Sequence, residues 1–125
     1  MNTYKVDETF KTPAIIGNVE EGTLLMKGRS LPENAKSFYM PFREWLLHYY
    51  SSPAKKLVVI IQLEYYNTAT SKLLVNLLLK LEKLKDKKEV VVEWRYDEDD
   101  LEMEETGLDF KNLIGDMILM KPVDS

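Results

Sequence analysis

The residues LVVIIQLEY at positions 57–65 constrain the fold of this chain more than any other segment. A nearly continuous run of β-branched and leucine side chains is typical of a strand that is covered on both faces. It is followed by leucines at helical spacing over residues 70–85, and then by the alternating strand pattern VVVEWRY at residues 90–96. A strand, a helix and a strand in this order indicate βαβ units, with parallel central strands and right-handed crossovers.

The N-terminal part of the chain predicts a hairpin rather than a βαβ unit. Residues 1–12 are polar and mixed, and we expect them to form a loose arm. Residues 14–19 and 23–27 are two short apolar-rich runs, and Gly22 between them accepts a positive φ at little cost. Two such runs around a short glycine-containing loop predict a β-hairpin.

An amphipathic helix is predicted after the hairpin. Ser30 and Glu33 have the spacing of a capping box at a helix start. The aromatic and leucine residues that follow repeat at helical spacing as far as Tyr50. Pro41 lies inside this pattern and removes one backbone hydrogen bond, so the helix is expected either to kink there or to break into two pieces.

The C-terminal part predicts a helix near residues 101–114 and a closing edge strand at residues 117–120. Neither an internal repeat nor an interdomain linker is present, so residues 13–125 are expected to form one domain. The predicted fold class is α/β, with an N-terminal β-hairpin followed by alternating helices and strands. The sheet is expected to be mixed, parallel at its centre and covered by helices.

The residue types exclude much of conventional enzyme chemistry. The chain has no cysteine, which excludes disulfides, zinc–thiolate sites and thiol catalysis. His48 is the single histidine, which leaves no basis for most catalytic triads and metal clusters, and the five glycines are scattered rather than gathered in a phosphate-binding loop. We therefore expect a protein without enzymatic activity and without a cofactor.

Charge and hydropathy indicate which partners to expect. The net charge of −4 argues against nucleic acid, whose phosphates are usually met by a basic face. The apolar runs are too short to cross a membrane, and the N-terminus lacks the apolar core of a signal peptide. We expect neither a nucleic-acid nor a membrane partner, and a location in the reducing cytoplasm, which suits a chain without cysteine.

Three charged or titratable features have a structural explanation. Residues 97–105 hold seven carboxylates, but their spacing does not fit a calcium-binding EF-hand loop. Carboxylates near a helix start, and the lysines between residues 80 and 88 near a helix end, are both favoured by the helix dipole. His48 lies on the predicted helix with no partner nearby in the sequence.

Residues 64–72, EYYNTATSK, are different in kind. Four side chains that can supply a capping oxygen gather where a buried strand becomes a helix: Asn67, Thr68, Thr70 and Ser71. One N-cap needs only one such side chain. Sites in open α/β sheets lie outside the carboxyl ends of strands, and the free N–H groups of a helix N-terminus favour a phosphate. Spacing alone leaves capping and function as equal alternatives.

The same junction resembles the Asp-Ser-Ser phosphorylation site of STAS-type anti-sigma-factor antagonists, with Asn67-Thr68 in the place of Asp-Ser. A closer resemblance is to the SiaC-like family of regulatory phosphoproteins. The matching motifs are Thr12-Pro13, Gly28-Arg29-Ser30, Pro32-Glu33-Asn34-Ala35, Phe38-Tyr39, Pro41, Trp45-Leu46, Leu63-Glu64-Tyr65-Tyr66-Asn67-Thr68, Ser71-Lys72, Trp94, Tyr96 and Gly107-x-Asp109-Phe110. Ala69 departs from the serine that the family often has, and the match is poor after Asn112.

This resemblance implies a STAS-like bacterial signalling protein, without enzymatic activity, in which Thr68 accepts a phosphate. A histidine-kinase-like Ser/Thr protein kinase would add the phosphate and a metal-dependent Ser/Thr phosphatase would remove it. The unphosphorylated form would bind and activate a diguanylate cyclase, the enzyme that makes c-di-GMP. Whether Thr70 or Ser71 also accepts phosphate stays open.

Four residues are expected to surround Thr68 and to contact the partner: Tyr66, Asn67, Thr70 and Ser71. Neighbouring strand residues point to opposite faces, so Tyr66 would stand beside Thr68 as an exposed anchor if Tyr65 ended on the helix-covered face. The alternative interpretation is a module that binds a small ligand or an anion at the same helix N-terminus.

Overall fold

A computed structural model describes residues 3–124, and in this range strands and helices alternate after three N-terminal strands. The strands are β1 (Thr3–Val6), β2 (Ala14–Asn18), β3 (Thr23–Ser30), β4 (Lys56–Tyr66), β5 (Glu89–Asp97) and β6 (Ile118–Val123), and the helices are α1 (Ala35–Ser51), α2 (Thr68–Leu84) and α3 (Leu101–Ile114). The predicted hairpin, the three helices and the closing strand are therefore confirmed. No helix in the described range is long and apolar enough to span a membrane.

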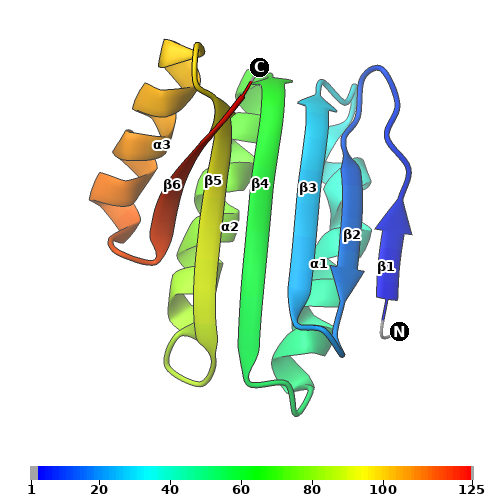
Figure 1. Cartoon of the computed structure of the whole chain (residues 1–125). Coiled ribbons are helices and arrows are strands. Elements are labelled where there is room, and N and C mark those ends of the chain that lie inside the picture. Colours follow the sequence, from blue (N-terminus) through cyan, green and yellow to red (C-terminus); the bar gives the residue numbers. More distant parts are fainter. Residues whose placement is uncertain (1–2, 125) are drawn as a thin grey trace.

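The described strands form one six-stranded sheet in the order β1-β2-β3-β4-β5-β6. Strand β2 is antiparallel to β1 and to β3, whereas β3, β4, β5 and β6 run parallel to their neighbours. The predicted α/β class with a mixed, centrally parallel sheet is confirmed. Figure 1 shows α1, α2 and α3 side by side behind this sheet.

The prediction that β4 is covered on both faces is wrong. Its residues alternate, with Leu57, Val59 and Ile61 buried and Val58 and Ile60 only half-buried. The reason is the strand order: each crossover from β3 to β6 moves to the next strand in the same direction. Right-handed crossovers in one direction place the helices on one face, so the opposite face of the sheet carries no helix within residues 3–124 (Figure 1).

The first residues differ from the expected loose arm. Thr3–Val6 form β1, in which Lys5 lies opposite Ile16 of β2. A strand this short carries no sequence signal of its own, because its order comes from hydrogen bonds to the neighbouring strand. The loop after β1 then returns over the end of β3, where the Leu31 N–H donates to the carbonyl of Lys11 over 2.6 Å.

The predicted capping box is also wrong. Ser30 is the last residue of β3 and is fully buried. Helix α1 begins after Asn34, whose side-chain oxygen accepts a hydrogen bond from the Ser37 N–H at 3.1 Å. Asn caps a helix as well as Ser does, and the Ser30 hydroxyl is engaged elsewhere. Helix α1 continues to Ser51 through Pro41, so the alternative of two helical pieces is not adopted.

The hydrophobic core lies between the sheet and the helical layer. Trp45 and Tyr49 of α1 are fully buried and stack with their ring centroids 5.8 Å apart. Gly17 of β2 gives the Trp45 ring room, because a Cβ at residue 17 would lie 2.7 Å from that ring. Trp94 of β5 is buried in the same way against α3, and its Nε1 donates to the carbonyl of Met103.

Candidate functional site

The start of α2 is capped by Asn67 and not by Thr68. The Asn67 backbone is extended (φ −90°, ψ 175°), and its side-chain oxygen accepts from the Thr70 N–H at 2.9 Å. Thr68 is the first residue of α2, so it stands at the carboxyl end of β4. Its side chain is exposed, and none of the hydrogen bonds found among residues 3–124 involves its hydroxyl. The Thr68 hydroxyl is therefore free for chemistry while its neighbour holds the helix.

Thr70 has a different place from the one predicted for a partner contact, because its side chain is 0% exposed. Its Oγ1 donates to the backbone carbonyl of Ser30 at 3.2 Å and lies 2.8 Å from Ser30 Oγ. Ser30 Oγ also lies 2.6 Å from the Tyr39 hydroxyl. Three buried hydroxyls, from α1, β3 and α2, thus form one chain. It fixes the first turn of α2 to the sheet and leaves Thr70 inaccessible to a partner.

The buried hydroxyl chain, defined by Tyr39, Ser30 and Thr70, can satisfy all of its donors. Tyr39 donates to Ser30 Oγ, Ser30 donates to Thr70 Oγ1, and Thr70 donates to the carbonyl of Ser30. Burial raises the pKa of Tyr39 above its usual value, and its hydrogen bond with Ser30 opposes that shift in part. The tyrosine is therefore a neutral donor, as this arrangement requires.

Tyr65 and Tyr66 have exchanged the faces that we expected. The pairing of β3 with β4 shifts after Gly28, which pairs with Leu63, so that Arg29 pairs with Tyr65 and one residue of β4 is left over. Such a β-bulge moves every later side chain to the other face of the sheet. Gly28 has a φ of 125°, which only glycine adopts without strain. Tyr65 is consequently 55% exposed on the helix-free face.

Tyr66 lies on the helix-covered side, half-buried against the core. Burial raises its pKa, and a side-chain hydrogen bond with Thr106 of α3 lowers it by less. Tyr66 is thus a link between β4 and α3 with an accessible edge, rather than a free-standing anchor. Ser71 lies in the first turn of α2 and is half-buried.

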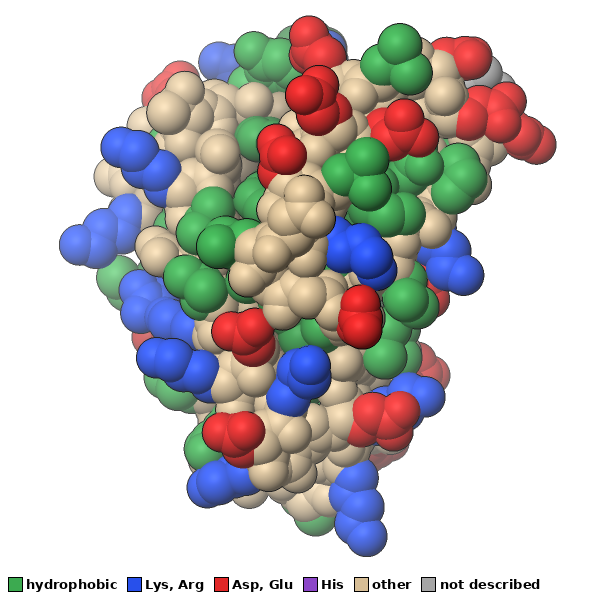
Figure 2. Space-filling model, turned by 90° about the vertical axis from the view of Figure 1, so that its left-hand side faces the viewer, with side chains coloured by type: hydrophobic (Ala, Val, Ile, Leu, Met, Phe, Trp, Pro, Cys, Tyr) green, Lys and Arg blue, Asp and Glu red, His purple; other side chains and the backbone are tan. Residues whose placement is uncertain are grey.

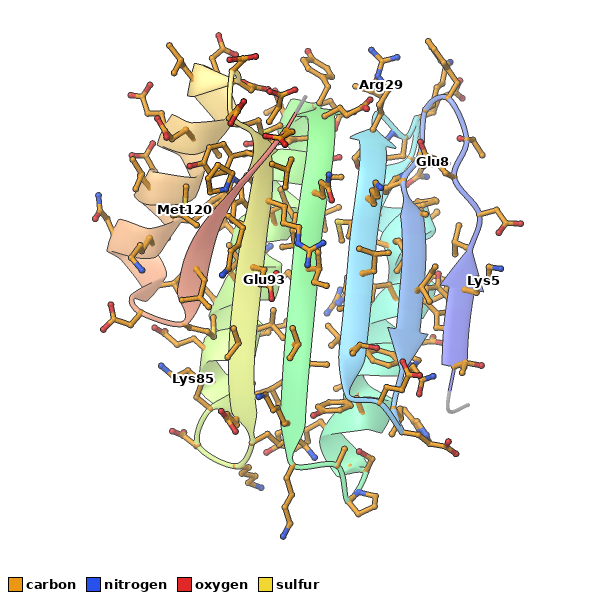
Figure 3. The ribbon with its side chains drawn as sticks, viewed as in Figure 1. Lys5, Glu8, Arg29, Lys85, Glu93 and Met120 are labelled. Carbon is orange, nitrogen blue, oxygen red and sulfur yellow. The ribbon has the colours of Figure 1, made fainter. Side chains whose placement is uncertain are left out.

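Arg29 lies at this edge and was not singled out as a site residue in the sequence. Figure 3 places Arg29 and Glu8 at the upper end of the sheet, where β3 ends. The Arg29 guanidinium lies 4.9 Å from the centre of the Phe10 ring, and it belongs to none of the ion pairs found among residues 3–124. Arg29 and the exposed Tyr65 are neighbours across β3 and β4. The only sequence signal for Arg29 was the Gly28-Arg29-Ser30 motif.

The acidic run takes the structural role predicted for it at a helix start, whereas Lys88 is buried instead of solvated at the end of α2. Asp100 caps α3, accepting from the Met103 N–H at 3.0 Å, with Glu102 and Glu104 in the first turn. Lys88 is buried and donates to the carbonyls of Ser52 and Ala54. Figure 2 shows carboxylates gathered at the upper end of the α3 face and cations at its left side and lower end. No group of His, Asp or Glu within residues 3–124 could hold a metal ion.

The chain matches a protein-family model and resembles a protein of Pseudomonas aeruginosa. The model of the SiaC family, described as regulatory phosphoproteins, matches residues 6–122. An uncharacterised protein of Pseudomonas aeruginosa (strain UCBPP-PA14) is 28% identical over 112 residues, which cover 89% of each chain.

Two solved structures from Pseudomonas aeruginosa share the fold. SiaC superposes with a TM-score of 0.85 and 25% identity over 100% of both chains. SiaC as it occurs in a crystal structure of the diguanylate cyclase SiaD with its activator SiaC superposes with a TM-score of 0.90 and 25% identity, over 96% of this chain and 99% of that one.

Proposed function

Because this chain belongs to the SiaC family of regulatory phosphoproteins, we propose that it is a non-enzymatic switch controlled by a phosphate on Thr68. In this proposal the unphosphorylated form binds and activates a diguanylate cyclase; SiaC of Pseudomonas aeruginosa is the activator in the complex with the cyclase SiaD. The observation that carries the proposal is the exposed, unbonded hydroxyl of Thr68 on the first residue of α2. A kinase can reach this hydroxyl without unfolding the domain.

The neighbouring hydroxyls are poorer acceptors for physical reasons. The Thr70 hydroxyl is fully buried and hydrogen-bonded, so phosphorylation would require the first turn of α2 to leave the sheet. Ser71 is half-buried behind that turn. Thr68 alone combines exposure with a position at the helix N-terminus, where free N–H groups and the positive end of the dipole favour an added phosphate.

The phosphate acts on the surface rather than on the fold. It adds about −1.5 to −2 charge at neutral pH. That charge enters an edge where Tyr65 and the free edge of Tyr66 are accessible to a partner. A cyclase docked over this edge would have to bury the charge or lose contact. A histidine-kinase-like Ser/Thr kinase adds the phosphate, and a metal-dependent Ser/Thr phosphatase removes it. Because the kinase uses ATP, we expect the switch to operate in the cytoplasm.

Thr68 is expected to take up one phosphate per chain from the cognate kinase and ATP. Mass spectrometry of the intact protein and of its peptides would give the number and the position. Thr68→Ala should remain unmodified, and the matched variant Ser71→Ala should be modified like the natural chain. Full phosphorylation of Thr68→Ala would contradict the proposal.

The two neighbours at the start of α2 are expected to differ in their effects on stability. Asn67→Ala removes the cap and should lower the free energy of unfolding by about 1 kcal/mol. Thr68→Ala removes a hydroxyl without a hydrogen bond and should change it by less than about 0.5 kcal/mol. Urea denaturation of both variants measures this difference. Equal losses would mean that Thr68 shares the capping role and is not free.

Phosphorylated Thr68 is expected to leave the melting temperature nearly unchanged, because the charge meets the helix dipole favourably, by roughly 0.3–1 kcal/mol when exposed. A fall of about ten degrees or more would mean that the modification acts by unfolding the domain, since about 1 kcal/mol shifts the midpoint by only a few degrees in a chain of this size.

A further inference from the structure

A groove runs between α1 and α2 on the outer side of the helical layer, where the two helices touch at few points. Its upper part is a cavity of about 200 Å³ that reaches down to the buried Met26 and Leu74. Its lower part, about 380 Å³, begins at Arg43, Leu46 and Lys80, which line both parts. The groove extends along α2 from Leu73 to Leu84, which is about 17 Å at the helical rise, and the buried Thr70 lies below its upper end.

The lining of this groove is apolar, and its rim is positively charged. Leu47 is 69% exposed and Tyr50 is 39% exposed on the α1 side of the lower part. The charged residues of the lining are Arg43, Lys80 and Lys83, and no carboxylate joins them. At the lower end the Lys87 ammonium lies 5.1 Å from the centre of the Tyr50 ring. The rim therefore carries only positive charge, although the net charge of the chain is −4.

The rim cations Arg43, Lys80 and Lys83 form no ion pair within the part of the chain that the structure describes. Partial burial lowers the pKa of Lys80, and repulsion from Arg43 and Lys83 lowers it further. A bound carboxylate would relieve that repulsion, so the rim favours an acidic occupant.

The shape of the groove favours a helix over a small ligand. Lys80 and Lys83 are one helical turn apart on α2, and Arg43 faces them from α1. A single anionic head group would meet only part of this row, whereas carboxylates repeated along a helix would meet all of it. The trough between two neighbouring helices also suits the packing of a third helix, whose apolar side chains enter at i, i+3, i+4 and i+7.

We propose that the α1–α2 groove is a second docking site, which takes an acidic amphipathic helix of a partner protein. Its charged rim is distinct from the Thr68 edge, because Lys80 follows Thr68 by 12 residues on α2, which is about 18 Å at the helical rise. Phosphate on Thr68 should therefore have little effect on this site. The protein would then connect a phosphate-controlled partner with one that is bound constantly.

The test uses a fluorescent peptide of about 18 residues, in which leucines repeat at helical spacing and glutamates flank the leucine stripe on both sides, where they can reach the rim. Fluorescence anisotropy measures its affinity for the natural chain. Arg43→Glu combined with Lys80→Glu should weaken binding at least about tenfold. Lys27→Glu, which reverses one charge on the helix-free face, should leave it unchanged. A twin peptide with lysine in place of glutamate should not bind.

A second pair of variants separates apolar docking from charge attraction. Leu47→Ser in the groove should weaken peptide binding, and Leu113→Ser, which removes a leucine of similar exposure from α3, should not. Phosphorylation of Thr68 should change the affinity by less than about threefold. Equal binding by groove and control variants would overturn the proposal. So would palmitate occupying the groove in place of the peptide, or a self-association that the groove variants abolish.

This test does not depend on the proposed switch. If the natural chain binds the acidic peptide and no cyclase, the switch assignment fails and the groove stands. If it binds a cyclase in a phosphate-dependent way but treats both peptides alike, the groove assignment fails and the switch stands.

Discussion

Phosphorylation of Thr68 is expected to lower the affinity for the cognate diguanylate cyclase by at least about tenfold, because a charge misplaced in an interface commonly costs several kcal/mol and each 1.4 kcal/mol is a factor of ten. The site lies at the exposed start of α2, two residues after the half-buried Tyr66. Isothermal titration calorimetry of the phosphorylated and unmodified chains against the cyclase would give the ratio.

The variants of Thr68 separate charge from shape. Thr68→Ala should bind like the unmodified chain and should keep that affinity after kinase treatment. Thr68→Glu should weaken binding less than phosphate does, because a carboxylate carries about one charge instead of nearly two. Treatment with the phosphatase should restore full binding. Equal affinities of the phosphorylated and unmodified forms would contradict the switch, and tighter binding by the phosphorylated form would reverse its sign.

Removing the Ser30 hydroxyl is expected to lower the free energy of unfolding by about 1–3 kcal/mol, the cost of leaving a buried polar group unsatisfied. In Ser30→Ala the buried Tyr39 hydroxyl loses its acceptor, and Thr70 Oγ1 loses one of its two contacts. The backbone carbonyl of residue 30 remains for Thr70, so the loss should be partial. Chemical denaturation monitored by tryptophan fluorescence measures it.

A double-mutant cycle gives this prediction its control. Tyr39→Phe removes the other end of the same bond, so Ser30→Ala with Tyr39→Phe should cost less than the sum of the two single losses. Ser37→Ala removes a hydroxyl from an exposed position on α1 and should have little effect. Additive losses in the cycle would mean that the Ser30–Tyr39 bond contributes nothing. The affinities of folded Ser30→Ala for the peptide and for the cyclase would show whether the buried hydroxyl chain also positions the start of α2.

Local patterns in the sequence determined much of this fold. The alternation of residues 90–96 predicted β5, the spacing of the leucines after residue 70 predicted α2, and Gly22 between two apolar runs predicted the hairpin. These signals are local because helical and strand periodicities repeat within a few residues. The strand–helix–strand order was then sufficient to predict a parallel sheet centre. Thr68 was placed at the strand-to-helix junction by the same reasoning, and α2 begins at Thr68, two residues before the predicted start. The role of Thr68 as phosphate acceptor came from the family resemblance.

The tertiary structure alone decided which faces the side chains occupy. The bulge between Gly28 and Arg29 exchanged Tyr65 and Tyr66, and a shift in pairing between two strands leaves no trace in the period of either strand. Ser30, which has the spacing of a capping residue, became instead the centre of the buried hydroxyl chain because Tyr39 and Thr70 converge on it from other elements. The helix-free face and the α1–α2 groove likewise depend on how whole elements pack. Contacts between residues far apart in the chain set all of these features, and a pattern that extends over a few neighbouring residues carries no information about them.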